Sequence, residues 1–222
     1  GLKENKFGVS EESALNLYKK AKTMDSILIK GIDCHIGSQI TDLKPFEDSV
    51  KKLITLIDKL EEEGIKIQHL DIGGGIGISY ENEKAIPFDD YANAVTTLTK
   101  GRDFKILLEP GRVIMADAGA ILTKVEYVKK TQDKNFAIID AAMNDLMRPS
   151  LYGAFHKIFN TSETTDKESV FDIVGPICET GDFIGKDRVI SIEPNNILVI
   201  MDTGAYAMSM SSNYNTRPRL YE

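Results

Sequence analysis

The stretch IQHLDIGGGIG, residues 67–77, decides the fold, because a short apolar strand in it runs directly into a cluster of glycines. Residues 67–72 have the length and the apolar side chains of a buried strand. A backbone without side chains at the end of such a strand can approach an anion with its amide groups. A tight turn that needs positive φ angles is the alternative, and this stretch alone leaves both interpretations open. The four glycines are Gly73, Gly74, Gly75 and Gly77.

The spacing of these glycines differs from that of the known nucleotide-binding loops. No residues in the sequence satisfy the dinucleotide pattern G-x-G-x-x-G, and no lysine stands where a phosphate-binding P-loop would have one. The glycine cluster therefore gives little support to an NAD-binding or a nucleotide-binding protein.

The sequence on either side of residues 67–77 alternates predicted helices with predicted strands. A first helix begins after Ser10, which is a favourable N-cap, and two more are predicted over residues 45–64 and 91–101. Further apolar strands are predicted at residues 27–34 and 104–108. This alternation is typical of βα units around a parallel sheet, and it predicts an α/β fold.

After about residue 116 the pattern changes to apolar runs without long helices between them. These runs cover residues 120–128, 136–139, 170–174 and 197–202, and they predict a second, mainly β domain. A complete barrel of βα units takes about 250 residues, and the first part of the chain has room for only some of them. We therefore expect the chain to be a truncated form of a longer protein.

Composition narrows the possible partners. The formal net charge of −7 disfavours nucleic acid and anionic membrane surfaces, because both attract basic proteins. Two cysteines, Cys34 and Cys178, are too few for a disulfide framework, which indicates a reducing compartment such as the cytoplasm. The three histidines lack the short paired spacing of zinc ligands, so the sequence predicts no metal site.

Polar residues follow three of the predicted strands in the first domain. They lie at residues 34–39, at the glycine cluster and at residues 109–112. Barrel enzymes place their active sites at the carboxyl ends of the strands, so these three segments are candidates for one site. The simpler alternatives are a half-buried histidine at His35 and a surface ion pair between Glu109 and Arg112, which would contribute little stability.

The second domain carries further candidates. Arg148 and Tyr152 are expected in a loop after the strand that ends near Asp140, and an arginine there suits a carboxylate ligand. Cys178 and Glu179 follow another strand, where the thiol is either a proton donor or a chance neighbour of the carboxylate.

Six motifs in this order resemble the fold-type III pyridoxal-phosphate decarboxylases, and among them most closely the decarboxylases that act on diaminopimelate. The resemblance implies that residues 1–115 are the C-terminal part of an alanine-racemase-like TIM barrel that binds pyridoxal 5'-phosphate. Residues 116–222 would be a β domain that is incomplete at its C-terminus. The motifs are CHIGSQ (34–39), DIGGGIG (71–77), LLEPGR (107–112), DAAMNDLMRPSLY (140–152), GPICETGD (175–182) and DTGAYAMSMSSNYNTRPR (202–219).

The resemblance also implies roles around the cofactor. His35 would be a catalytic residue that stacks on the pyridine ring, and Glu109 would pair with the pyridine nitrogen. Ser38 and Tyr206 would contact the phosphate. The other residues implied to hold the phosphate are Gly74, Gly75, Gly111 and Arg112.

For the substrate, the resemblance implies a carboxylate site made by Arg112, Arg148 and Tyr152. Glu179 would bind the distal ammonium group, and Cys178 would act as a catalytic proton donor in the active site of the neighbouring subunit of a homodimer. The implied reaction converts meso-2,6-diaminopimelate to L-lysine and carbon dioxide. A small-molecule amino acid is therefore the expected substrate, without a nucleic-acid or membrane partner.

Two departures from the family pattern bear on activity. The lysine that forms a Schiff base with the cofactor lies in a segment resembling YAVKAN, which the printed sequence does not contain, so we expect this chain alone to be inactive. Ala207 stands where glycine is usual. The alternatives are a related decarboxylase of carboxynorspermidine, ornithine or arginine, and a dimerising remnant without catalysis.

Overall fold

The computed structural model describes residues 6–165 and 167–221, and the chain divides into two compact units. Residues 79–83 belong to the second unit although they interrupt the first one in the sequence. Unit 1 comprises Gly1–Ile78 and Lys84–Val113, and unit 2 comprises Ser79–Glu83 and Ile114–Glu222.

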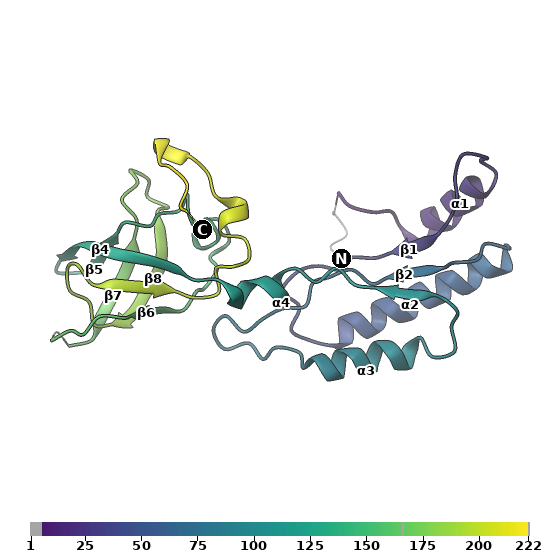
Figure 1. Ribbon diagram of the computed structural model, residues 1–222, viewed down its shortest axis with the longest axis horizontal. Coiled ribbons are helices and arrows are strands. Elements are labelled where there is room, and N and C mark those ends of the chain that lie inside the picture. Colours follow the sequence, from purple (N-terminus) through teal and green to yellow (C-terminus); the bar gives the residue numbers. More distant parts are fainter. Residues whose placement is uncertain (1–5, 166, 222) are drawn as a thin grey trace. The chain divides into compact units, whose positions relative to one another are not determined.

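Unit 1 is built on a parallel sheet of three strands in the order β1-β2-β3 (Figure 1). Its middle strand is fully buried at Leu70, which pairs in register with Ile32 on one side and Ile106 on the other. Because the strands are parallel, their carboxyl ends meet at one edge of the sheet. The strands are β1 (Gly31–Asp33), β2 (His69–Asp71) and β3 (Lys105–Leu107).

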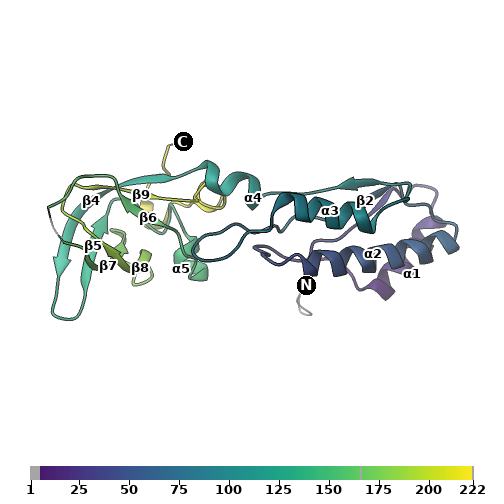
Figure 2. The same ribbon diagram turned by 90° about the horizontal axis from the view of Figure 1, so that it is seen from below.

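The helices α2 and α3 connect these strands and α1 precedes the first of them, with α2 lying beside both α1 and α3 (Figure 2). The predicted helices are confirmed. Ser10 caps α1 by accepting a hydrogen bond from the amide of Ser13, and a proline opens α2, whose apolar stripe includes the buried Ile57 and Leu60. The helices are α1 (Glu11–Lys22), α2 (Lys44–Glu62) and α3 (Phe88–Leu98).

The strands of unit 1 are shorter than the sequence predicts. Residues 27–34 were expected to form one strand, yet only Gly31–Asp33 pairs with β2, and Leu28 is 74% exposed. The apolar run is longer than the ladder because a strand extends only as far as its neighbour offers backbone partners.

Unit 2 is mainly β, as predicted. Its described strands form a six-stranded sheet in the order β6-β9-β4-β5-β7-β8, and among these described pairs only β5–β7 is parallel. The sequence did not predict β6 and β8, because neither has an uninterrupted apolar run. The strands are β4 (Ile121–Lys130), β5 (Asn135–Ile139), β6 (Ile158–Asn160), β7 (Ser169–Val174), β8 (Phe183–Ile190) and β9 (Ile197–Ile200).

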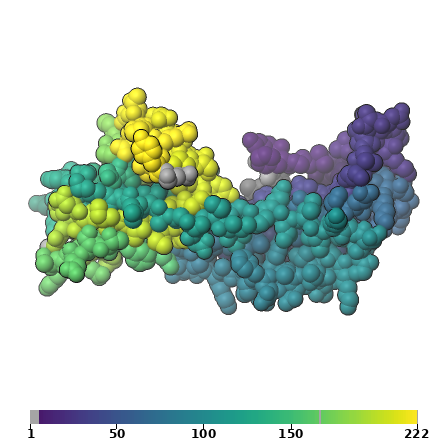
Figure 3. All heavy atoms as spheres, viewed as in Figure 1, coloured from purple at the N-terminus to yellow at the C-terminus, as the bar shows by residue number. Residues whose placement is uncertain are grey.

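The remaining helices are short, and one of them corrects the sequence prediction. Residues 148–152 were expected in a loop but form a helix, α5, which begins with a proline in its first turn and ends at Gly153 in the left-handed conformation. The C-terminal segment, yellow in Figure 3, lies raised on the surface of unit 2. The short helices are α4 (Arg112–Met115), η1 (Ala116–Ala118), α5 (Arg148–Tyr152), η2 (Met208–Met210) and η3 (Tyr214–Thr216).

None of the helices in the described part of the chain combines the length with the apolar character that crossing a bilayer requires. The α/β fold with βα units followed by a mainly β part agrees with the sequence prediction of a partial barrel and a β domain.

Candidate functional site

The carboxyl edge of the unit 1 sheet brings three polar segments together. The amide of Gly74 donates to Nδ1 of His35 at 3.3 Å, and the amide of Glu109 donates to the carbonyl of Gly73 at 2.9 Å. Nη2 of Arg112 donates to Oγ of Ser38 at 3.1 Å. The loops after β1, β2 and β3 are therefore in direct contact, as expected for a site at the carboxyl ends of parallel strands.

His35 has a defined hydrogen-bonding role in this arrangement. Because Nδ1 accepts from Gly74, the neutral imidazole carries its proton on Nε2. The side chain is exposed at the edge of the sheet rather than enclosed in the core, which disfavours the alternative of a half-buried structural histidine. An imidazole in this position is free to lie against a planar ligand.

The glycine loop after β2 has no room for side chains. A Cβ at Gly74 would collide with the carbonyl oxygen of Glu109, and one at Gly75 would collide with the carbonyl oxygen of Gly37. Gly73 and Gly75 also have φ angles of +69° and +100°, which side-chain-bearing residues rarely adopt. The loop is thus a tight turn with a closely packed backbone, which confirms the turn interpretation. Its approach to an anion stays a prediction.

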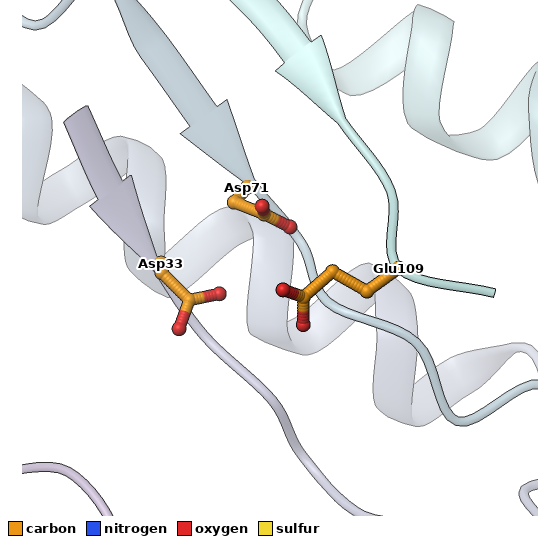
Figure 4. Close-up of side chains that lie close together, drawn as sticks. All are labelled: Asp33, Asp71 and Glu109. Atoms are coloured by element: carbon orange, nitrogen blue, oxygen red, sulfur yellow. The ribbon is translucent and has the colours of Figure 1, made fainter. Parts of the chain in front are cut away.

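Three carboxylates converge at the same edge (Figure 4). Oxygens of Asp33, Asp71 and Glu109 lie within 4.8 Å of one another, and Oδ1 of Asp71 also accepts from the amide of Gly73 at 2.9 Å. Like charges this close favour a positively charged group among them. This chemistry suits a cationic ligand atom as well as a metal ion.

Of these three acids, only Glu109 was predicted from the sequence as a site residue. The signal for the other two was their position, because Asp33 and Asp71 are the last residues of neighbouring strands and pair with each other in register. The prediction that no metal site exists rested on histidine spacing and did not consider these carboxylates.

In unit 2, Arg148 is buried and held from two sides. Its Nη1 lies 2.8 Å from Nε2 of His156, and its guanidinium lies 4.6 Å from the centre of the Tyr80 ring. His156 is fully buried, and its Nδ1 lies 2.9 Å from the carbonyl oxygen of Met201. Since arginine can only donate, Nε2 of His156 accepts and its Nδ1–H donates to Met201.

His156 and Tyr80 were not predicted from the sequence, because Tyr80 lies far from Arg148 in the chain and His156 lies outside the motifs. Tyr152, at the other end of α5, is 68% exposed. Of the three residues expected to bind the substrate carboxylate, the two in unit 2 thus differ in their surroundings: Arg148 is buried and fixed, whereas Tyr152 is exposed.

The segment that carries Cys178 and Glu179 is organised by a buried aspartate. The carboxylate of Asp182 accepts from the amides of Met143 and Ile177, each at 2.7 Å. Burial is the main cause that raises the pKa of Asp182 above its ordinary value. Asp182 therefore joins the 175–182 segment to the loop after β5, while Cys178 and Glu179 remain exposed at the surface.

The C-terminal segment contacts the same region. The hydroxyl of Tyr214 donates to Oε2 of Glu179 at 3.1 Å. Nε of Arg217 donates to Oδ1 of Asn144 at 3.0 Å, and its Nη2 lies 3.6 Å from a carboxylate oxygen of Asp145. Burial raises the pKa of Asp145, although Arg217 and the hydrogen bonds of the carboxylate act in the opposite direction.

Tyr206, the expected phosphate contact, lies in a strained backbone segment. It has a φ of +64° and is 37% exposed. The preceding Gly204 packs so closely that a Cβ would collide with the carbonyl oxygen of Met115, while its amide donates to Ala116 at 3.0 Å. Ala207 is buried in the unit 2 core, so this departure from the family pattern is accommodated by packing.

Residues 1–116 match the family model described as pyridoxal-dependent decarboxylase, pyridoxal binding domain. Over its whole length the chain is 48% identical to the diaminopimelate decarboxylase of Vibrio cholerae serotype O1 and 51% identical to that of Neisseria meningitidis serogroup B, covering 54% of each protein. The chain thus spans about half the length of the curated relatives it matches.

Solved structures give the same result. The structure of diaminopimelate decarboxylase from Helicobacter pylori complexed with L-lysine has a TM-score of 0.93 to this chain at 44% identity, covering 99% of this chain and 55% of that one. The family resemblance inferred from the six sequence motifs is confirmed. Since the family model matches more than half of the chain, the chain belongs to the pyridoxal-dependent decarboxylases.

Proposed function

We propose that this protein acts in the pyridoxal-phosphate-dependent decarboxylation of meso-2,6-diaminopimelate to L-lysine and carbon dioxide, a step of lysine biosynthesis. The observation that carries the proposal is the convergence of His35, Ser38, Glu109 and the glycine loop at one edge of a parallel sheet. The similarity to diaminopimelate decarboxylases over the whole chain supports this substrate.

The residues at this edge fit pyridoxal phosphate. Ser38 and Arg112 offer a hydroxyl and a guanidinium 3.1 Å apart for a phosphate, and the packed glycines let backbone amides approach it. His35 offers a flat imidazole, and Glu109 offers a carboxylate. We infer that Gly74, Gly75, Gly111, Arg112, Ser38 and Tyr206 hold the phosphate.

When bound, pyridoxal phosphate supplies an electron sink for the electron pair left behind when carbon dioxide departs. The protein's own contribution is to keep that sink effective. Glu109 would hold a proton on the pyridine nitrogen, since a carboxylate stabilises the cationic ring. His35 would cover one face of the ring and fix its orientation.

Substrate recognition would use Arg112 of unit 1 together with residues of unit 2. Arg148 is suited to a carboxylate because its guanidinium is already fixed by His156 and Tyr80, so little conformational freedom is lost on binding. We propose that Arg112, Arg148 and Tyr152 bind the carboxylate, that Glu179 binds the distal ammonium, and that Cys178 donates a proton to the active site of a partner subunit in a homodimer.

The L-lysine in the Helicobacter pylori complex supports an amino acid of this size as product. The negative charge of the chain favours a small-molecule substrate over nucleic acid, and its two free cysteines suit the cytoplasm.

The proposal is tested by measuring lysine formation from meso-diaminopimelate with added pyridoxal phosphate. The printed polypeptide is assayed alone and in a form extended upstream through a lysine-bearing strand. We expect turnover only in the extended form, and Glu109→Gln should reduce its kcat by about 100-fold because the ring loses its cationic partner. Consumption of ornithine, arginine or carboxynorspermidine instead of diaminopimelate would show that the substrate assignment is wrong.

A further inference from the structure

A short parallel ladder joins the loop after β1 to the glycine loop after β2. The amide of Ile40 donates to the carbonyl of Gly75, and the amide of Gly77 donates back to the carbonyl of Ile40, both at 2.9 Å. Ile40 and Ile76 thereby form an isolated parallel bridge outside the named strands. The two loops that carry Ser38 and the glycines are thus fastened to each other beyond the end of the sheet.

The side chain of Gln39 extends this ladder by one peptide unit. Its Nε2 donates to the carbonyl of Ile78 at 2.6 Å, and its Oε1 accepts from the amide of Ile78 at 3.2 Å. A primary amide carries a donor and an acceptor on separate atoms, so it can satisfy the N–H and the C=O of one residue at the same time. Gln39 therefore imitates a strand residue with its side chain.

The backbone of Gln39 takes a conformation that residues other than glycine rarely adopt. Its φ is +58°, and the neighbouring Gly77 lies so close that a Cβ there would be 3.0 Å from the Gln39 carbonyl carbon. Such a conformation persists only when surrounding contacts hold it, and the pair of hydrogen bonds to Ile78 is one such contact, beside the ladder at Ile40.

We propose that Gln39 is a positioning residue for the cofactor phosphate. Its two hydrogen bonds to Ile78 fix the turn that presents Ser38, so that the serine hydroxyl and the glycine-loop backbone face the same anion. The hydroxyl of Ser38 also accepts a hydrogen bond from Arg112 at 3.1 Å. We call the two hydrogen bonds between Gln39 and Ile78 the clamp. In this proposal the clamp sets the positions of the Ser38 hydroxyl and of the glycine-loop backbone. This inference rests on the proposed function, because it assumes that Ser38 and the glycine loop bind a phosphate.

The physical basis is preorganisation. An anion site binds well when its donors are already in place, since ordering them on binding would reduce the affinity. Removing the Gln39 amide leaves the glycines and Ser38 present but releases their relative position. A variant without the Gln39 amide should therefore bind phosphate-bearing ligands more weakly, whereas its recognition of the pyridine ring should be unchanged.

The test compares Gln39→Gly with the wild-type chain. Glycine accepts the positive φ without strain, so the variant removes the clamp and keeps the backbone conformation available. Dissociation constants are measured by fluorescence titration for pyridoxal phosphate, for pyridoxal, which lacks the phosphate, and for inorganic phosphate in competition. We expect pyridoxal phosphate and inorganic phosphate to bind about 10-fold more weakly, with the affinity for pyridoxal and the midpoint of thermal unfolding unchanged.

Two further variants serve as matched tests. Gln39→Glu keeps an acceptor for the Ile78 amide but opposes a carboxylate oxygen to the Ile78 carbonyl, so it should also weaken phosphate binding. Asn195→Gly removes a side chain at another positive φ, +70° in unit 2, and should change none of the three affinities. If Gln39→Gly does not fold, Gln39→Glu decides the question.

The outcomes separate this inference from the proposed function. Equal weakening of pyridoxal and pyridoxal phosphate, or unchanged binding of both, would overturn the role of Gln39 and leave the cofactor site standing. A wild-type chain that binds neither pyridoxal phosphate nor inorganic phosphate would overturn the cofactor site, and the role of Gln39 with it.

Discussion

At the scale of single residues, the two histidines in contact with candidate site residues show how surroundings decide a role. His35 accepts at Nδ1 from a glycine amide, whereas His156 accepts at Nε2 from Arg148 and donates at Nδ1. His35 was predictable because it follows a predicted strand within a recognisable motif. His156 was not, because its partner Arg148 and its acceptor Met201 come together only in the folded unit.

Asp202 is a residue whose ionisation should oppose folding. It is partly buried, and desolvation raises its pKa above the ordinary value, while Asp117 raises it further and Lys157 lowers it. A raised carboxyl pKa means that the folded state binds the proton more tightly than the unfolded state. Stability is therefore lost as the pH rises from the ordinary pKa through the folded pKa, and it is regained on acidification.

We expect Asp202→Asn to raise the midpoint of thermal unfolding at pH 7, because the buried charge is removed. Asparagine tolerates the φ of +58° that Asp202 has, so the substitution should not strain the backbone. The difference between the two proteins should shrink towards zero below about pH 3, where the aspartate is protonated in both the folded and the unfolded state. Scanning calorimetry at both pH values measures this, and an equal difference at the two pH values would contradict it.

At the scale of elements, α5 shows the limit of local prediction. Its residues contain Pro149 and were expected in a loop, but Pro149 lies in the first turn of a helix, where the missing amide has no partner to lose. The helix carries Arg148 and Tyr152, and it ends at Gly153 with a φ of +63°. A five-residue helix has little stability of its own, so the residues that cap its ends should affect the stability of the helix.

Gly153→Ala should destabilise unit 2 by about 1 kcal/mol, because alanine is strained in the left-handed conformation. A Cβ at Gly153 would meet nothing within 4 Å, so the effect reports backbone strain rather than a steric clash. Gly153→Asn is the matched control and should cost less, since asparagine adopts this conformation more readily. Urea unfolding gives both free energies; equal losses for the two variants would count against a backbone origin.

At the scale of the whole molecule, the unit 1 sheet has an edge strand on either side. β1 and β3 each pair only with β2 among the described strands, and the residues at the β3 edge include Leu107 and Leu108, which are 42% and 51% exposed. Unpaired edges with apolar side chains favour association with other strands. The assignment of residues 1–115 to a cofactor-binding barrel and of residues 116–222 to a β domain stays a prediction.

We expect the printed polypeptide to self-associate with increasing concentration, and Leu107→Lys to reduce this, because a charge on an edge strand opposes strand pairing. Leu151→Lys makes the same change at a residue that is 54% exposed on α5 and should have little effect. Light scattering coupled to size exclusion measures both. Self-association that is unaffected by Leu107→Lys would place the contact elsewhere.

The sequence by itself determined the α/β class, the long helices, the mainly β second part and the family, because apolar periodicity and short motifs are local properties of the chain. Glu109, His35 and Ser38 could be named in advance since each follows a predicted strand. Only the tertiary structure decided which groups meet: Asp33 with Asp71, Arg148 with His156, and Gln39 with Ile78. Those contacts depend on strand register and on packing between distant segments, which no local pattern encodes.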